Sequence, residues 1–207
     1  MLPTRPRRGS FPGAAARAVA PFVFSRWRVT LETRKNALRD EVRRRPRGTP
    51  EASRAAQERL LASGLIAGNV GLYRALPSEC GTDLLASALG ERACFPCVVP
   101  GQAELQFRRE GGAWSRGPLG VLEPGGELVP LHDIEVLVVP AVAVDLQGRR
   151  LGRGRGHYDA TLAVFAGGSV ALVFESQLVP EVPVGEHDHP VGAVCTEARL
   201  VLARSAR

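Results

Sequence analysis

Lysine is almost absent from this chain of 207 residues, since Lys35 is the only lysine among its 27 basic residues. Aromatic residues make up only 5% of the sequence, and no RRM or KH signature is present, which argues against an RNA-binding module. No apolar run reaches the roughly 18 residues that a membrane-spanning helix needs. The sequence therefore predicts a folded protein with no nucleic-acid or membrane partner.

The excess positive charge is confined to the N-terminus. Of 27 basic and 21 acidic residues, six arginines and no acid lie in residues 1–31, so the rest of the chain carries 21 charges of each sign. A balanced body has no overall field that would attract nucleic acid. We interpret residues 1–30 as a basic, disordered extension, with a mitochondrial presequence as the alternative. The predicted location is the cytoplasm, or the mitochondrial matrix if the segment is a presequence.

The cysteines do not indicate a disulfide framework, because no secretory signal is recognisable in the sequence. Cys94 and Cys97 have C-x-x-C spacing, but the chain has no second pair to complete a tetrahedral zinc site. Both lie in residues 93–99, which are expected to form a buried strand in which positions three apart face opposite sides. We therefore interpret Cys80, Cys94, Cys97 and Cys195 as structural.

Helical and extended patterns alternate along the chain. Thr49 and Pro50 are typical of a helix start, and Thr82 is expected to cap another helix. We expect helices at residues 31–45, 50–63, 83–89 and 158–165, strands at 69–73, 93–99, 134–140 and 170–174, a hairpin-like piece at 104–107, a loop at 177–192 and short apolar stretches at 193–203. This order predicts a single α/β domain over residues 31–207, with a largely parallel sheet, helices on both faces and ligands at the carboxyl edge.

The segment Arg150-Leu-Gly-Arg-Gly-Arg-Gly-His-Tyr-Asp159 lies between a predicted strand and a predicted helix. Its alternating glycines allow a ligand to approach the backbone, and the N–H groups at the following helix start can bind an anion. Arg153 and Arg155 can add charge-assisted contacts, and Asp159 can hold a cation on the same phosphates. The pattern matches neither G-x-x-x-x-G-K-[ST] nor G-x-G-x-x-G. A polyphosphate loop and a flexible basic turn both fit it.

Further motifs accompany this loop in a fixed order, and together they resemble the 5-formyltetrahydrofolate cyclo-ligase family over about residues 31–197. The most specific match is Gly148-Arg-Arg-Leu-Gly-Arg-Gly-Arg-Gly-His-Tyr-Asp159. The weaker matches are Arg34-Lys35 with Arg39, Tyr73, Leu76-Pro-Ser-Glu79, Thr82, Gly117-Pro-Leu-Gly-Val-Leu-Glu-Pro124, Asp133, Val139-Pro140, Asp145, Gln177-Leu-Val-Pro-Glu-Val-Pro183 and His187-Asp188.

This resemblance implies an ATP-dependent ring closure of 5-formyltetrahydrofolate to 5,10-methenyltetrahydrofolate, with ADP and phosphate as products and magnesium as cofactor. In the mechanism assigned to the family, the formyl oxygen attacks the γ-phosphorus of ATP, N10 of the folate closes the ring, and phosphate leaves. The implied fold is a three-layer α/β sandwich of the NagB/RpiA/CoA-transferase-like type. A self-sufficient domain of this size is expected to be a monomer.

The resemblance also implies roles for particular residues. It places Asp159 and Asp188 at the magnesium site, and it assigns catalysis to Arg153, His157 and Tyr158. Folate contacts are expected at Arg74, Glu79, Arg155 and His157. ATP contacts are expected at Lys35, Arg39, Arg150, Leu151, Gly152, Arg153, Gly154, Arg155, Gly156, His157 and Tyr158.

One position departs from the family pattern. The family has Gly-Tyr-Tyr-Asp where this chain has Gly156-His-Tyr-Asp159. Histidine keeps a flat ring and can form hydrogen bonds, but it can also change charge near neutral pH. We expect activity to survive with an altered pH profile or substrate affinity. A divergent substrate, a silent ATP-binding protein and a nucleic-acid-binding protein that uses its arginine-rich segments are the alternatives.

Overall fold

The computed structural model describes residues 30–203, so the basic extension predicted for residues 1–30 lies almost entirely outside the described residues. The helices are α1 (Leu31–Arg43), α2 (Pro50–Ala62), α3 (Asp83–Leu89) and α4 (His157–Val164). The strands are β1 (Asn69–Gly71), β2 (Ala93–Cys97), β3 (Gln106–Arg109), β4 (Ser115–Arg116), β5 (Leu122–Glu123), β6 (Leu128–Val129), β7 (Ile134–Val139), β8 (Ala143–Val144), β9 (Arg150–Leu151), β10 (Gly168–Leu172), β11 (Ala193–Cys195) and β12 (Leu200–Leu202). No helix within residues 30–203 has the length and apolar character needed to cross a bilayer.

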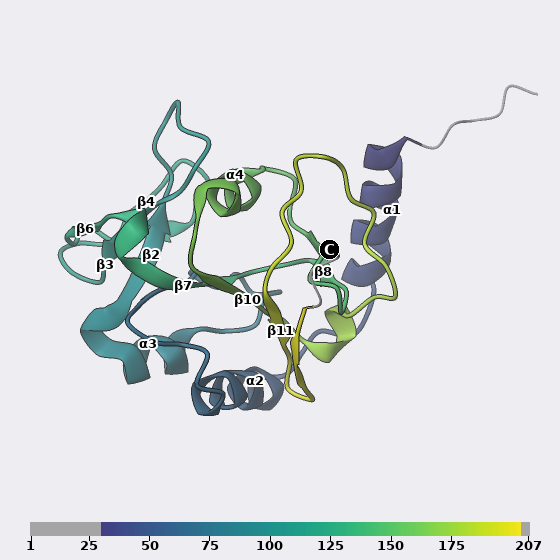
Figure 1. The fold of residues 1–207 in the computed structure, drawn as a ribbon, viewed down its shortest axis with the longest axis horizontal. Coiled ribbons are helices and arrows are strands. Elements are labelled where there is room, and N and C mark those ends of the chain that lie inside the picture. The colour runs from purple at the N-terminus through teal and green to yellow at the C-terminus, as the bar shows by residue number, and fades with distance from the viewer. Residues whose placement is uncertain (1–29, 204–207) are drawn as a thin grey trace, which may run out of the picture.

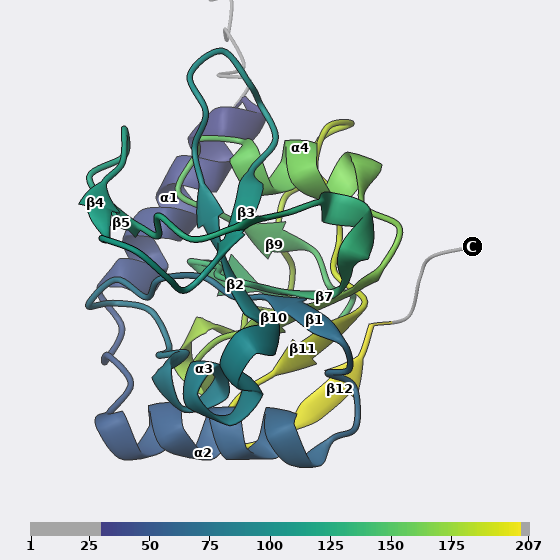
Figure 2. The ribbon, with the colours of Figure 1, turned by 90° about the vertical axis from the view of Figure 1, so that its left-hand side faces the viewer.

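The main sheet has eight strands in the order β12-β11-β10-β7-β1-β2-β3-β6. The pairs β11-β10, β10-β7, β7-β1 and β1-β2 are parallel, whereas β12, β3 and β6 add antiparallel strands at the two edges. Helices α2 and α3 cover one face of this sheet and α4 covers the other, which gives three layers (Figures 1 and 2). The predicted α/β class with a largely parallel sheet is confirmed.

The central strands bury side chains on both faces of the sheet. In β7, Val136 and Val138 pack into the apolar cluster beneath α2 and α3, while Leu137 and Val139 pack into the cluster on the α4 side. Consecutive side chains of a strand point to opposite faces, so a strand between two helical layers must be apolar at nearly every position. This is why the residues at 136–139 are apolar without interruption, whereas Glu135 at the start of the strand is exposed.

The sequence predicted where α2 and α3 begin, but it named the wrong capping side chain for α3. Thr49 accepts a hydrogen bond from the N–H of Ala52 at 3.2 Å and caps α2, as expected. Thr82 precedes α3 but does not cap it, because its hydroxyl donates to the carbonyl of Tyr73 at 2.6 Å. Gln57 of α2 supplies the cap instead, since its Oε1 accepts from the N–H groups at the start of α3, those of Leu84 and Leu85.

The connection between β7 and the glycine-rich loop differs from the prediction. We expected the loop to follow the strand at 134–140 directly, but a hairpin of β8 and β9 lies between them, and the loop segment begins in strand at Arg150 and Leu151. Asp145 is fully buried in the hairpin turn and accepts hydrogen bonds from the N–H groups of Gln147 and Arg149. This turn fixes the point from which the glycine-rich loop departs.

The four cysteines are free and buried, in agreement with the structural interpretation. Burial raises the pKa of the Cys80 thiol to about 11 and the pKa values of Cys94 and Cys195 to about 12. Thiols that stay protonated at neutral pH are poor nucleophiles and poor metal ligands. These cysteines therefore act as small apolar side chains in the core.

Candidate functional site

A cleft of about 610 Å³ opens beside the carboxyl ends of β1, β2 and β7, and α1, the glycine-rich loop and the segment 187–189 contribute to its walls. Side chains from sequence positions more than 150 residues apart therefore meet in one place. Every residue assigned from the sequence lines this cleft, namely Lys35, Arg39, Arg74, Glu79, Arg150, Leu151, Gly152, Arg153, Gly154, Arg155, Gly156, His157, Tyr158, Asp159 and Asp188. Their common location is a finding, whereas their individual roles stay predictions.

The glycine-rich loop runs from β9 into α4 and holds two glycines in the left-handed region. Gly154 has φ +89° and Gly156 has φ +77°, conformations that cost other residues free energy. Gly156 is also the N-cap of α4, and no side chain caps this helix start. The first N–H groups of a helix have no partner within the helix, so this end of α4 is suited to binding an anion.

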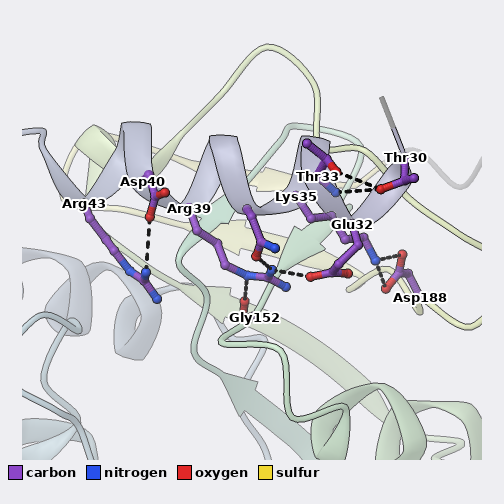
Figure 3. A network of polar contacts seen from close by, with 10 residues as sticks. Thr30, Glu32, Thr33, Lys35, Arg39, Asp40, Arg43, Gly152 and Asp188 are labelled. Atoms are coloured by element: carbon purple, nitrogen blue, oxygen red, sulfur yellow. Dashed lines mark hydrogen bonds and ion pairs between the residues drawn. The ribbon is translucent and has the colours of Figure 1, made fainter. Parts of the chain in front are cut away.

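Helix α1 is tied to the glycine-rich loop by Arg39, which is 7% exposed. Its Nε donates to the carbonyl oxygen of Gly152 at 3.0 Å, and its Nη1 donates to Glu32 at 2.8 Å (Figure 3). A side chain at position 154 would meet the guanidinium of Arg39, since an added Cβ there lies 3.4 Å from its Nη2. Arg39 therefore packs against the loop and limits which residues the loop can contain.

Lys35 lies one helical turn before Arg39 and forms an ion pair across the cleft. Its Nζ lies 2.8 Å from Oδ1 and 2.5 Å from Oδ2 of Asp188 (Figure 3). Asp188 Oδ2 also accepts from the N–H of Gly185. Burial raises the pKa of the Asp188 carboxyl. The hydrogen bonds from Lys35 and Gly185 and the positive charges of Lys35 and Arg150 lower it by more, so the pKa lies below its usual value. Asp188 is therefore ionised at neutral pH and can bind a cation.

Arg150 forms the buried base of the cleft, with its side chain 2% exposed. Its Nη2 donates to Oδ1 of Asp159 at 2.9 Å, and its guanidinium lies 5.8 Å from the ring centre of Tyr158. Burial lowers the pKa of Arg150, an effect that Asp159 opposes. Within residues 30–203, Arg150 Nε and the Tyr158 hydroxyl are buried without a hydrogen-bond partner. Such groups are costly unless a ligand or water satisfies them.

Glu79 and Arg153 join the loop at residues 76–79 to the glycine-rich loop. Arg153 Nε lies 3.0 Å from Glu79 Oε1, and Arg153 Nη2 donates to the hydroxyl of Ser78 at 2.9 Å. The second carboxylate oxygen of Glu79 accepts from the N–H of Leu76 at 2.9 Å. The sequence assigned these two residues to different substrates, and it gave no indication that they pair with each other.

His157 begins α4 and contacts the loop that follows β2. Its Nδ1 lies 2.8 Å from the carbonyl oxygen of Ala103, which can only accept, so Nδ1 carries the proton. Thr161 extends this link, since its hydroxyl donates to the carbonyl of His157 at 2.7 Å and accepts from the N–H of Leu105 at 2.9 Å. Neutral His157 therefore presents Nε2 as a hydrogen-bond acceptor. Arg155 stays exposed beside it.

Arg74 follows β1 and lies 5.2 Å from the ring centre of Trp114, within the range of a cation–π contact. Trp114 meets Phe95 of β2 edge to face at 5.3 Å, which anchors the indole on the core. The sequence left the role of Arg74 open. The contact explains how a guanidinium can be held over an apolar wall, and Trp114 is a residue that sequence reasoning missed.

Other cleft residues were also missed. Leu119, Val121 and Glu123 line the cleft from the β4–β5 hairpin, with Glu123 Oε1 accepting from the N–H of Val98 at 3.1 Å. They lie within the motif at residues 117–124, which the resemblance identified without assigning a role. Their position in an ordered series of matched motifs was the signal that could have identified them.

The two predicted metal ligands, Asp159 and Asp188, line the same cleft. Among residues 30–203, no group of three or more His, Cys, Asp or Glu side chains is arranged to hold a metal ion, so the protein alone does not form a complete site. Asp159 accepts from Arg150 and from the N–H of His189 through Oδ1, which leaves Oδ2 for another partner. Magnesium is usually held by one or two carboxylates with substrate phosphates and water. The two aspartates fit that arrangement.

The chain is similar to characterised proteins over most of its length. The 5-formyltetrahydrofolate cyclo-ligase family matches residues 25–197. The 5-formyltetrahydrofolate cyclo-ligase of Mycolicibacterium smegmatis is 34% identical over 187 residues, which cover 82% of this chain and 96% of that protein. The Mus musculus enzyme of the same name is 25% identical over 196 residues, with the same two coverages. The NMR structure of Aquifex aeolicus 5,10-methenyltetrahydrofolate synthetase is 27% identical, covers 84% of this chain and 94% of its own, and superposes with a TM-score of 0.71.

Proposed function

The chain belongs to the 5-formyltetrahydrofolate cyclo-ligase family, and we propose that its cleft uses ATP to close 5-formyltetrahydrofolate into 5,10-methenyltetrahydrofolate, releasing ADP and phosphate. The observation that carries this proposal is the cleft itself. An uncapped helix start with four basic side chains, Lys35, Arg39, Arg150 and Arg153, lies in the same 610 Å³ space as an apolar wall and the carboxylate of Glu79. Phosphates and a planar heterocycle can therefore be bound side by side.

The nucleotide is assigned to the side of the cleft formed by α1 and the glycine-rich loop. The N–H groups at the start of α4 face outward to the phosphates, and Lys35 adds a point charge on a flexible stem. Buried Arg150 supplies Nε, a donor that has no partner among the described residues. Phosphoryl transfer depends mainly on positioning and charge stabilisation, which is what these groups provide.

Magnesium is assigned to Asp159 and Asp188, with oxygens of the ATP phosphates completing its ligands. When bound, the ion neutralises part of the charge on the phosphates. Lys35 and Arg150 pair with these carboxylates in the structure, so binding of MgATP would exchange these two ion pairs for contacts with the metal ion and the phosphates.

The folate is assigned to the side of the cleft formed by Glu79, Arg74 and the β4–β5 hairpin. A carboxylate accepts hydrogen bonds from neighbouring amino and ring N–H groups, which a pterin presents in one plane. Leu119, Val121 and Pro96 give this side an apolar wall against which a flat ring can pack. Arg155, exposed at the loop, is assigned to the same substrate.

In the proposed reaction the formyl oxygen attacks the γ-phosphorus and ADP leaves. N10 then attacks the formyl carbon and loses its proton, and the original formyl oxygen departs with the phosphoryl group as phosphate. Arg153 stabilises charge on the transferring group. Burial raises the pKa of Tyr158, so its hydroxyl stays protonated and can donate to a developing oxyanion. His157 Nε2, an acceptor in the neutral ring, can receive the N10 proton.

We further propose that residues 31–207 form one cyclo-ligase domain that acts as a cytoplasmic monomer, and that residues 1–30 are dispensable for catalysis. The match of the family to residues 25–197 covers most of this domain, and it begins six residues before the proposed start at residue 31. The equal numbers of acidic and basic residues after position 31 support small molecules rather than nucleic acid as partners.

The decisive experiment mixes the purified full-length protein with ATP, magnesium and 5-formyltetrahydrofolate and follows the near-ultraviolet absorbance of the methenyl product. We expect a rise that requires all three components. ATP binding without any rise in absorbance would contradict the proposed activity and would favour a divergent substrate or a silent relative. His157 would then be the first residue to replace, with the tyrosine of the family pattern.

A further inference from the structure

The ion pair between Glu79 and Arg153 connects the two substrate regions of the cleft. Glu79 belongs to the loop after β1, and Arg153 to the glycine-rich loop after β9, so the pair spans 74 positions of sequence. Among the ion pairs formed within residues 30–203, it is the one that joins the glycine-rich loop to the loop at residues 76–79. Whether this ion pair is formed or broken therefore affects the binding of both proposed substrates.

The two partners are held very differently. Glu79 is 10% exposed, and its carboxylate and N–H both bond to Leu76, at 2.9 Å each. Arg153 is 44% exposed and is anchored only through its side chain, to Glu79 and Ser78. It lies between Gly152 and Gly154, so its backbone is not restrained by bulky neighbours. Arg153 is therefore the partner that can move, while Glu79 stays in place.

Both carboxylate oxygens of Glu79 accept hydrogen bonds in the structure. Oε1 receives Arg153 and Oε2 receives the N–H of Leu76. A pterin that donates two N–H groups to this carboxylate must compete with the guanidinium, which is a charged donor and the stronger partner. A nucleotide phosphate offers Arg153 an alternative anion of higher charge, to which a guanidinium can bind through two N–H groups.

Resting on the proposed function, we propose that Arg153 couples the two substrates: binding of the nucleotide phosphates withdraws Arg153 from Glu79 and thereby opens the carboxylate for the pterin. Nucleotide then binds before folate, and each substrate raises the affinity of the other. The reciprocity is required thermodynamically, since a folate held on Glu79 also leaves Arg153 free for phosphate.

The Lys35–Asp188 pair provides a contrast within the same cleft. Both of its members are assigned to the nucleotide and its metal ion, so breaking this ion pair would free groups that bind the nucleotide and none that bind the folate. The Glu79–Arg153 pair is different because its members are assigned to two ligands. Coupling between the substrates is therefore attributed to Arg153 and not to the basic residues of the cleft in general.

The first test measures nucleotide affinity in the absence of folate, with a non-hydrolysable ATP analogue and magnesium in a calorimeter. Glu79→Gln removes the competitor of the phosphate for Arg153, so we expect the analogue to bind roughly threefold to tenfold more tightly than to wild type. Glu123→Gln is the matched control, because it removes the same charge from the same cleft but breaks no ion pair. Equal effects of the two substitutions would overturn the proposal.

The second test measures binding of 5-formyltetrahydrofolate with and without a saturating amount of the analogue. In wild type we expect the analogue to tighten folate binding roughly fivefold or more. In Arg153→Ala, folate should bind without nucleotide at least as tightly as in wild type, and the analogue should no longer improve it. An undiminished improvement in Arg153→Ala would contradict the role of Arg153.

The two tests separate this inference from the proposed function. If wild type binds no 5-formyltetrahydrofolate with or without the analogue, the folate assignment fails, and the nucleotide measurements on Glu79→Gln and Glu123→Gln still decide whether Glu79 competes for Arg153. If wild type binds the folate equally well in both conditions, the folate assignment stands and the coupling is wrong.

Discussion

Helices α2 and α4 begin in opposite ways. At α2, Thr49 caps the N–H of Ala52 and Pro50 occupies the first turn, so the helix start is satisfied within the chain. At α4, Gly156 stands at the N-cap in a left-handed conformation, and no side chain caps the start. The cap stabilises the start of α2, whereas the uncapped start of α4 has N–H groups that can bind an anion.

The same difference extends to the surroundings of the two helix starts. Within α2, the buried side chain of Gln57 donates to the carbonyl of Ser53 and accepts from the N–H groups of Leu84 and Leu85. Next to α4, Arg150 and Tyr158 retain buried polar atoms without partners among residues 30–203. Buried polar atoms without partners therefore lie in the cleft that we propose as the ligand site, and not around Gln57.

The largest effect in this comparison is expected from removing Lys35. Lys35→Ala deletes the cation that we assign to the ATP phosphates, so kcat/KM for ATP should fall on the order of 100-fold. Arg34→Ala is the control, since it removes a positive charge from the adjacent, exposed position of α1. Steady-state kinetics with varied ATP decides this, and equal losses in both variants would remove Lys35 from the site.

A smaller effect is expected from closing the open helix start itself. Gly156→Ala places a side chain at φ +77°, where nothing lies within 4 Å of the added Cβ, so the cost is backbone strain of about 1 kcal/mol. Gly64→Ala carries the same strain at φ +72°, also with nothing within 4 Å, and Gly64 does not line the cleft. Both variants should lose similar stability in urea unfolding.

Only Gly156→Ala should also weaken binding of the ATP analogue, by roughly tenfold. If Gly64→Ala weakens nucleotide binding to the same extent, the loss comes from lowered stability rather than from the α4 anion site. If neither variant does, the open helix start is not used by the phosphates.

A moderate effect is expected at the position that departs from the family pattern. His157→Tyr removes a ring that can change charge near neutral pH, and it also removes the acceptor Nε2. We expect a changed pH dependence of kcat, because a phenol cannot take up the N10 proton in the role proposed for Nε2, with KM for the folate changed about two- to fivefold. Identical pH profiles for the variant and wild type would show that His157 does not exchange protons during turnover.

The smallest effect on activity is expected at the closed helix start. Thr49→Ala removes the α2 cap and should lower the free energy of unfolding by about 1 kcal/mol while leaving the kinetic constants unchanged. Thr49→Ser, which keeps the hydroxyl, should retain most of that stability. Loss of activity in Thr49→Ala at a temperature where the protein stays folded would contradict the separation between structural and ligand-binding helix starts.

The fold was largely predictable from local sequence. The largely apolar run at 134–139 identified a strand buried on both faces, and Thr49-Pro50 identified the start of α2. The hairpin of β8 and β9 was missed because its strands have two residues each, too few to show a periodic pattern. The cap of α3 was assigned to Thr82 because local rules consider only neighbours in sequence, whereas the capping Gln57 comes from another helix.

The candidate site was predictable only in part. The glycine-rich loop and the ordered motifs identified residues that all line one cleft. Pairs such as Lys35 with Asp188, 153 positions apart, leave no local pattern because a single sequence records neighbours along the chain and not across the fold. The contact of Arg74 with Trp114 was missed for the same reason.

The sequence by itself determined the parts of this protein whose physics is local: helix periods and caps, buried strands, and a loop whose glycines permit φ values above zero. The tertiary structure decided which of these parts meet. It paired Arg153 with Glu79, buried Arg150 beneath Tyr158, and left the start of α4 open to the cleft. Interactions between charges and between buried polar groups depend on distance and burial, and both are set by the packing of distant segments against one sheet.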